Sequence, residues 1–82
     1  MTIADVLREA AHKLTTISET PRLDAELLMA EALGTDRGAM LLNRMRDDVP
    51  SGFAPLLNRR LNHEPVAYII GRQDLWTLTL AV

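Results

Sequence analysis

The stretch of sequence that decides the fold is Asn58-Arg59-Arg60-Leu61-Asn62-His63-Glu64-Pro65-Val66-Ala67-Tyr68-Ile69-Ile70-Gly71. Ahead of it the apolar residues recur at helical spacing, whereas in residues 75–82 beyond it they alternate with a period of two, which is typical of a strand. Proline ends a helix because it lacks the amide hydrogen, and glycine lets the chain leave the helical path. The stretch therefore predicts a helix ending at Glu64-Pro65, one further helical turn up to Gly71, and one or two strands of a β-hairpin after it.

Two amphipathic helices are predicted upstream of this stretch. In residues 3–17 the apolar side chains recur at three- and four-residue steps, and Thr2 with Asp5 has the pattern of a capping box. A second helix is predicted for residues 21–33, ended by Gly34, which can adopt the left-handed conformation that closes a helix. Its expected apolar face consists of Leu23, Leu27, Ala30 and Leu33, flanked by Leu28 and Met29.

Two shorter helices complete the predicted bundle. The third is expected to contain Met40 and Met45 and to be capped by Thr35 or Asp36. The fourth is expected to begin between positions 51 and 55, because Pro55 disfavours helical geometry at the preceding residue. The predicted fold class is all-α, a small four- to five-helix bundle followed by the start of a β-hairpin. We expect residues 1–64 to form the bundle and residues 65–82 to form the joint and hairpin.

The composition sets limits on the class of protein. The 82 residues are 48% hydrophobic and only 4% aromatic, so the core must consist mainly of Leu, Ile, Val, Ala and Met. Nine Lys and Arg against eleven Asp and Glu give a net charge of -2, which favours neither a nucleic-acid surface nor a basic membrane-binding helix. Cysteine is absent, and no apolar run approaches the ~20 residues of a membrane span. With no basic, apolar leader at the N-terminus, a cytoplasmic protein is expected.

A catalytic constellation is not recognisable in the sequence. There is no glycine-rich phosphate loop, no metal-ligand spacing and no nucleophile, histidine and acid grouping, so no catalytic, cofactor-binding or metal-binding residue is assigned. His12 and His63 are expected at the surface. The acidic residues Asp24, Glu26 and Glu31 lie along one predicted helix, and because nothing in the sequence indicates burial, we expect them to form a solvated face.

Four residues are candidates for contact with a partner or with another domain: Arg59, Arg60, Tyr68 and Trp76. The two arginines lie near a predicted helix C-terminus, where an arginine can bind a partner's carboxylate, cap backbone carbonyl groups or complement the helix dipole. The two aromatic residues combine an apolar ring with a polar group, as interface residues often do, and they can equally fill the joint between bundle and hairpin.

The order of several short motifs resembles a known family. These motifs are Pro21-Arg22-Leu23-Asp24-Ala25-Glu26-Leu27-Leu28, Leu33-Gly34, Arg59-Arg60, and Glu64-Pro65-Val66-Ala67-Tyr68-Ile69-Ile70-Gly71 leading to Asp74-Leu75-Trp76. Together they are similar to the amino-terminal domain of the HemK/PrmC family, the release-factor glutamine methyltransferases. The resemblance spans nearly the whole chain.

The resemblance implies a two-domain enzyme that acts in translation termination. The parent protein would be an S-adenosylmethionine-dependent protein methyltransferase that modifies the glutamine of the Gly-Gly-Gln motif in class I peptide chain release factors. The family's cofactor and catalytic residues lie in a second domain that this chain lacks, so the chain alone would be non-catalytic and would bind no cofactor. Its implied partners are the release factor and the catalytic domain, and its implied role is to bind and orient the release factor.

Other interpretations remain open at this point. A stand-alone helical interaction module could add the strand of residues 75–82 to a partner's sheet. The strand-like run at the end of the chain favours a fragment of a longer protein over such a module. Nucleic-acid modification by a related methylase would need concentrated positive charge, which the sequence does not have.

Overall fold

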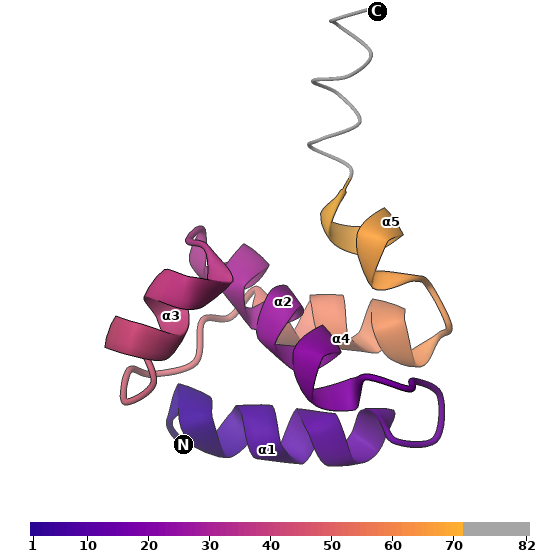
Figure 1. The fold of residues 1–82 in the computed structure, drawn as a ribbon, viewed down its shortest axis with the longest axis horizontal. Helices are drawn as coiled ribbons and strands as arrows, with labels where there is room; N and C mark the ends of the chain where they lie inside the picture. Colours follow the sequence, from indigo (N-terminus) through magenta and orange to yellow (C-terminus); the bar gives the residue numbers. More distant parts are fainter. Residues whose placement is uncertain (72–82) are drawn as a thin grey trace, which may run out of the picture.

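Five helices make up the part of the chain that the structure, a computed structural model, describes, which is residues 1–71. They are α1 (Ile3–Leu14), α2 (Pro21–Leu33), α3 (Arg37–Asn43), α4 (Phe53–Leu61) and α5 (Val66–Ile70). Figure 1 shows α2 in the middle of the bundle, with α1 on one side and α5 on the other. The all-α fold class predicted from the sequence is confirmed for these residues.

Helix α1 begins where both the side chains and a distant loop satisfy its first amide groups. The Thr2 hydroxyl accepts from the Asp5 amide and the Asp5 carboxylate accepts from the Thr2 amide, which confirms the predicted capping box. The Ile3 and Ala4 amides donate to the carbonyl oxygens of Asp47 and Met45, both at 3.0 Å. The start of α1 is thereby attached to the loop between α3 and α4.

The core lies mainly between α1 and α2. From α1, the side chains of Ile3, Leu7, Ala10 and Leu14 are buried, at the spacing that the sequence predicted. Each fully buried large apolar side chain contributes about 1.5–3 kcal/mol relative to an exposed one. The core is completed by these residues of the other helices: Ala25, Leu28, Met29, Ala30, Met40, Phe53, Leu57 and Ile69.

Helix α2 differs from its predicted orientation because it packs against all four other helices. The expected face centred on Leu23 and Leu27 is wrong in part, since Leu23 is exposed while Leu28 and Met29 are completely buried. A helix surrounded by neighbours has no single apolar stripe, so the periodicity of its apolar residues does not identify one buried face. Gly34 ends α2 in the left-handed conformation with φ 74°, as predicted.

The two shorter helices of the middle of the chain start as the sequence indicates. The Asp36 carboxylate accepts from the Ala39 amide and caps α3. Helix α4 begins at Phe53, within the predicted range, and Pro55 lies in its first turn, where a missing amide hydrogen breaks no helical hydrogen bond. Among the helices of residues 1–71, α3 packs only against α2.

The short helix α5 is the further turn that the sequence predicted before Gly71. It packs against α2 and α4, with Ile69 buried. At Gly71 the backbone passes so close to the Ala67 carbonyl oxygen that a Cβ atom would collide with it. The chain thus leaves α5 at a position that only glycine fits.

The predicted β-hairpin falls on residues 72–82, which lie outside the described residues. The division into a bundle of residues 1–64 and a joint of residues 65–82 stays a prediction, as does strand addition to a partner's sheet. Within residues 1–71, the longest helix has 13 residues, and none is long and apolar enough to cross a membrane.

Candidate functional site

Two acidic side chains are buried in the part of the chain that the structure describes, and both come from α2. Asp24 is 7% exposed and Glu26 is 6% exposed. The expectation that these residues form a solvated face is therefore wrong, although Glu31 is only partly buried. Burying a carboxylate without a partner is costly, so the surroundings of each must supply donors and positive charge.

Asp24 is held by two nearby hydroxyl groups and by one arginine that is distant along the chain. The Ser18 hydroxyl donates to its Oδ2 at 2.6 Å and the Thr20 hydroxyl donates to its Oδ1 at 3.2 Å. From α4, the Nε atom of Arg60 donates to Oδ2 at 3.1 Å. We call Asp24, Ser18, Thr20 and Arg60 the Asp24 centre; it joins the α1–α2 loop and α2 to α4.

Arg60 also satisfies backbone carbonyl groups with its remaining nitrogens. Its Nη1 donates to the Glu64 carbonyl oxygen at 3.2 Å, and its Nη2 donates to the Ile17 carbonyl oxygen at 3.4 Å. Its side chain is only 14% exposed. Of the roles that the sequence left open, Arg60 caps carbonyl groups and binds a carboxylate of its own chain.

Arg59 reinforces the turn between α4 and α5. The His63 amide donates to the Arg60 carbonyl and the Glu64 amide donates to the Arg59 carbonyl, which together form a Schellman closure of α4. His63, with φ 72°, takes the left-handed position that glycine usually occupies. Arg59 forms an ion pair with Glu64 at 2.7 Å, and these hydrogen bonds raise the pKa of Arg59. The turn that leads to α5 is thus fixed by backbone and side chains together.

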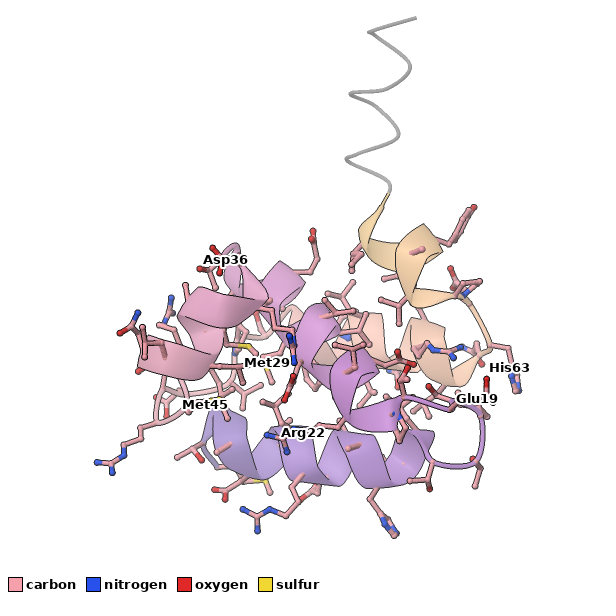
Figure 2. All side chains as sticks on the ribbon, viewed as in Figure 1. Glu19, Arg22, Met29, Asp36, Met45 and His63 are labelled. Carbon is pink, nitrogen blue, oxygen red and sulfur yellow. The ribbon has the colours of Figure 1, made fainter. Side chains whose placement is uncertain are left out.

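In the view of Figure 2, His63 and Glu19 of the α1–α2 loop project at the same end of the bundle. The side chains of His12 and His63 are both exposed, as the sequence predicted.

Glu26 is held by two arginines. Arg22 Nε donates to Oε2 at 2.8 Å, and Arg37 Nε donates to Oε1 at 2.7 Å. We call these three residues the Glu26 centre; it attaches the start of α3 to α2. Burial raises the pKa of Glu26, but the hydrogen bonds and charges of the two arginines outweigh burial and hold that pKa below its ordinary value. Glu26 therefore stays ionised at neutral pH.

Of the two aromatic candidates, Tyr68 lies in the described residues and Trp76 lies outside them. Tyr68 is 57% exposed on α5, one residue before the buried Ile69. The two arginines bind acceptors of their own chain, whereas Tyr68 presents most of its surface to solvent. The contact role of these four residues therefore stays a prediction.

The arrangement can hold helices together and present charge at the surface. Within residues 1–71, no three His, Asp or Glu side chains are grouped as a metal site. Sequence reasoning missed Asp24, Glu26, Arg22 and Arg37. The only local signal was the four-residue spacing of Arg22 and Glu26, which is usual for an exposed pair on a helix.

Comparison with known proteins identifies the family to which this small helical bundle belongs. The sequence profile of the family described as PrmC N-terminal domain matches residues 5–71. The chain therefore belongs to the PrmC N-terminal domain family, which confirms the resemblance found in the sequence.

The relatives compared here are all described as release factor glutamine methyltransferases. A release factor glutamine methyltransferase of Coxiella burnetii is 36% identical over 88 residues, covering all of this chain and 31% of the relative. Those of Corynebacterium glutamicum and Escherichia coli are each 37% identical, over all of this chain and 29% of the relative, and over 93% of this chain and 28% of the relative. The chain thus spans about three tenths of the length of the relatives that it matches. No solved structure gave a significant match.

Proposed function

We propose that this chain is the N-terminal, substrate-orienting domain of a protein methyltransferase that modifies a glutamine of peptide chain release factors. The observation that carries the proposal is the match of the whole chain to release factor glutamine methyltransferases, at 36% identity in one case. The glutamine is that of the Gly-Gly-Gln motif, as the family resemblance implies.

In this proposal the chemistry belongs to a domain beyond this chain. A methyltransferase of this family implies S-adenosylmethionine, which supplies the methyl group when bound. Such a cofactor is commonly held by a glycine-rich turn between a strand and a helix, and residues 1–71 contain only helices and their connections. The residues described do not fit the cofactor, so we assign none of them to it.

The contribution of this chain is binding and orientation. A domain that holds a protein substrate beside a catalytic centre converts part of the binding free energy into correct placement of the reacting group. The bundle is suited to this because the Asp24 centre and the Schellman turn fix α5, after which the chain leaves at Gly71. In our proposal Tyr68, and with it Trp76, contacts the catalytic domain or the release factor, while Arg59 and Arg60 hold the joint.

The decisive experiment uses the full-length protein with purified release factor and S-adenosylmethionine. We expect mass spectrometry to find one added methyl group on the glutamine of Gly-Gly-Gln, and none on a release factor with alanine in its place. Failure to methylate the release factor would contradict the proposed function.

The orienting role has its own measurement. A protein lacking residues 1–71 is expected to show a higher KM for release factor, while its KM for S-adenosylmethionine stays close to that of the full-length protein. A matched full-length variant, Tyr68→Ala, keeps the bundle and tests only the exposed ring. Unchanged KM for release factor in the truncated protein would contradict the orienting role.

A further inference from the structure

The Glu26 centre leaves positive charge at the molecular surface. Arg22 and Arg37 each use the Nε atom to bind Glu26, and within residues 1–71 the Nη atoms of neither arginine take part in a hydrogen bond. Their side chains are 47% and 45% exposed, whereas that of Glu26 is 8% exposed. Two guanidinium groups against one carboxylate give the centre a net charge of +1 and unused donors that reach solvent.

The two guanidinium groups are also held in place before any partner arrives. Arg22 comes from the first turn of α2 and Arg37 is the first residue of α3, and both converge on the same buried carboxylate. Figure 2 shows Arg22 on the side of α2 that faces the reader. Because each side chain is already fixed through Nε, binding a further acceptor loses little side-chain entropy.

A carboxylate is the acceptor that matches these donors. The outer edges of arginine groups bind planar carboxylates through paired hydrogen bonds, and a net charge of +1 is balanced by one Asp or Glu side chain. Nucleic acid would need a continuous basic stripe, which a chain of net charge -2 with mixed charges does not offer. Next to Arg22, the exposed Leu23 adds an apolar contact of the kind found in protein interfaces.

We propose that Arg22 and Arg37 form a docking point for an acidic segment of a protein partner, in which an Asp or Glu of the partner binds their outer nitrogens. The identity of the partner rests on the proposed function: if that function is correct, the acidic segment belongs to the release factor. The docking point acts on substrate binding and not on the methyl transfer itself.

Two variants at the same site change its charge in opposite directions. In the full-length enzyme, the triple variant Arg22→Gln, Glu26→Gln, Arg37→Gln removes the charges together and so avoids leaving Glu26 buried without a partner. We expect its KM for release factor to rise about five- to tenfold with kcat unchanged. The single variant Glu26→Gln keeps both arginines and raises the local charge to +2, so its KM is expected to fall about two- to threefold. Both changes should shrink as salt is raised.

The controls separate docking from folding and from general charge. Circular dichroism must show native helix content for each variant that is compared. Arg8→Gln removes an exposed arginine of α1 that pairs with Asp5, and its KM should equal that of the unmutated enzyme. Equal KM values for the triple variant, Glu26→Gln and the unmutated enzyme would overturn the docking point, while the enzyme's activity upheld the proposed function.

A direct binding experiment tests whether the docking point prefers carboxylates, and it does not depend on methylation. Fluorescent decaglutamate is titrated into the full-length protein and into the triple variant at low salt, with oligouridylate of matched charge as the competing probe. We expect decaglutamate to bind the unmutated protein at least fivefold more tightly than the triple variant, and oligouridylate to show no such difference. Equal decaglutamate binding to both proteins, or a loss confined to oligouridylate, would overturn the proposal.

Discussion

Asp24 and Glu26 lie two positions apart on α2 and are buried to nearly the same degree, but their partners differ in kind. Asp24 is satisfied by two hydroxyl groups and by one arginine whose side chain is only 14% exposed, whereas Glu26 is satisfied by two arginines that remain half exposed. In the Asp24 centre both members of the ion pair are withdrawn from solvent, so its role is structural. In the Glu26 centre only the carboxylate is withdrawn, so the same kind of interaction also leaves charge available for recognition.

The largest expected effect is loss of the arginine of the Asp24 centre. Arg60→Ala leaves the Asp24 charge buried without its ion-pair partner, so we expect the free energy of unfolding of the 82-residue chain to fall by about 3–5 kcal/mol. Urea denaturation followed by circular dichroism measures the change.

The double variant Asp24→Asn, Arg60→Gln is the matched control for that change. It removes both charges and keeps groups that can hydrogen bond, so it should lose less stability than Arg60→Ala alone. A loss below about 1 kcal/mol for Arg60→Ala would show that Asp24 does not depend on this arginine, and the distinction between the two centres would disappear.

Removing the arginines of the Glu26 centre one at a time should lower the free energy of unfolding in two unequal steps, because two arginines bind the same carboxylate. Arg22→Ala or Arg37→Ala alone is expected to cost about 1 kcal/mol, since the other, half-exposed arginine still compensates Glu26. The double variant should cost more than the sum of the two, because only then is the carboxylate left unpaired. Denaturant unfolding of the four proteins measures the coupling, and strict additivity would argue against a shared carboxylate.

The pH dependence of stability tests the Glu26 centre without changing an arginine. Because the folded protein holds the pKa of Glu26 below its ordinary value of 4.5, the unfolded chain binds more protons just below that pH. The stabilisation by ionised Glu26 is therefore complete above pH 4.5 and is lost as the pH falls through the lower, folded pKa.

Comparison with Glu26→Gln isolates this contribution from other acids. The pKa of Asp5 is also lowered, mainly by the hydrogen bonds that it makes with the Thr2 amide and hydroxyl, but Asp5 is present in both proteins. The stability difference between the unmutated chain and Glu26→Gln should shrink as the pH is lowered from 5. A difference that stayed constant over this range would contradict a lowered pKa at Glu26.

The smallest expected effect concerns the turn beside the Asp24 centre. A left-handed conformation costs a residue with a side chain about 1–2 kcal/mol, and glycine recovers most of this but is more flexible when unfolded. His63→Gly is therefore expected to raise the free energy of unfolding by about 0.5 kcal/mol, measured by thermal unfolding.

Gly34 provides the reverse control, since it closes α2 with nearly the same φ angle but is already a glycine. Gly34→Ala should destabilise by about 1 kcal/mol, and His63→Ala should change little because it keeps a side chain in the left-handed position. A stabilisation by His63→Ala equal to that by His63→Gly would locate the effect in the imidazole ring and not in the backbone.

Local chemistry could be predicted from the sequence because it involves neighbouring residues. The capping box of Thr2 and Asp5, the left-handed Gly34 and the short helix before Gly71 each depend on positions within a few residues of one another. The membership of the chain in its family likewise followed from the order of short motifs.

The two ion-pair centres could not be predicted in the same way. Asp24 meets an arginine 36 positions away and Glu26 meets one 11 positions away, and a single sequence does not show which distant charges become neighbours. The central position of α2 adds to this, because a helix with neighbours on several sides buries charged and apolar residues alike. The fold is therefore needed to distinguish the half-exposed arginines of the Glu26 centre from the much less exposed Arg60.

The close approach at Gly71 has a mechanical consequence. Because the Ala67 carbonyl leaves no room for a side chain there, α5 and the point of exit from the bundle move as one piece. A force applied to the chain after Gly71 is carried through α5 to the Glu64 carbonyl, then through Arg60 to Asp24 and into α2. The polar contacts at this end of the bundle thus share any tension on the exit with the packing of α5 against α2 and α4.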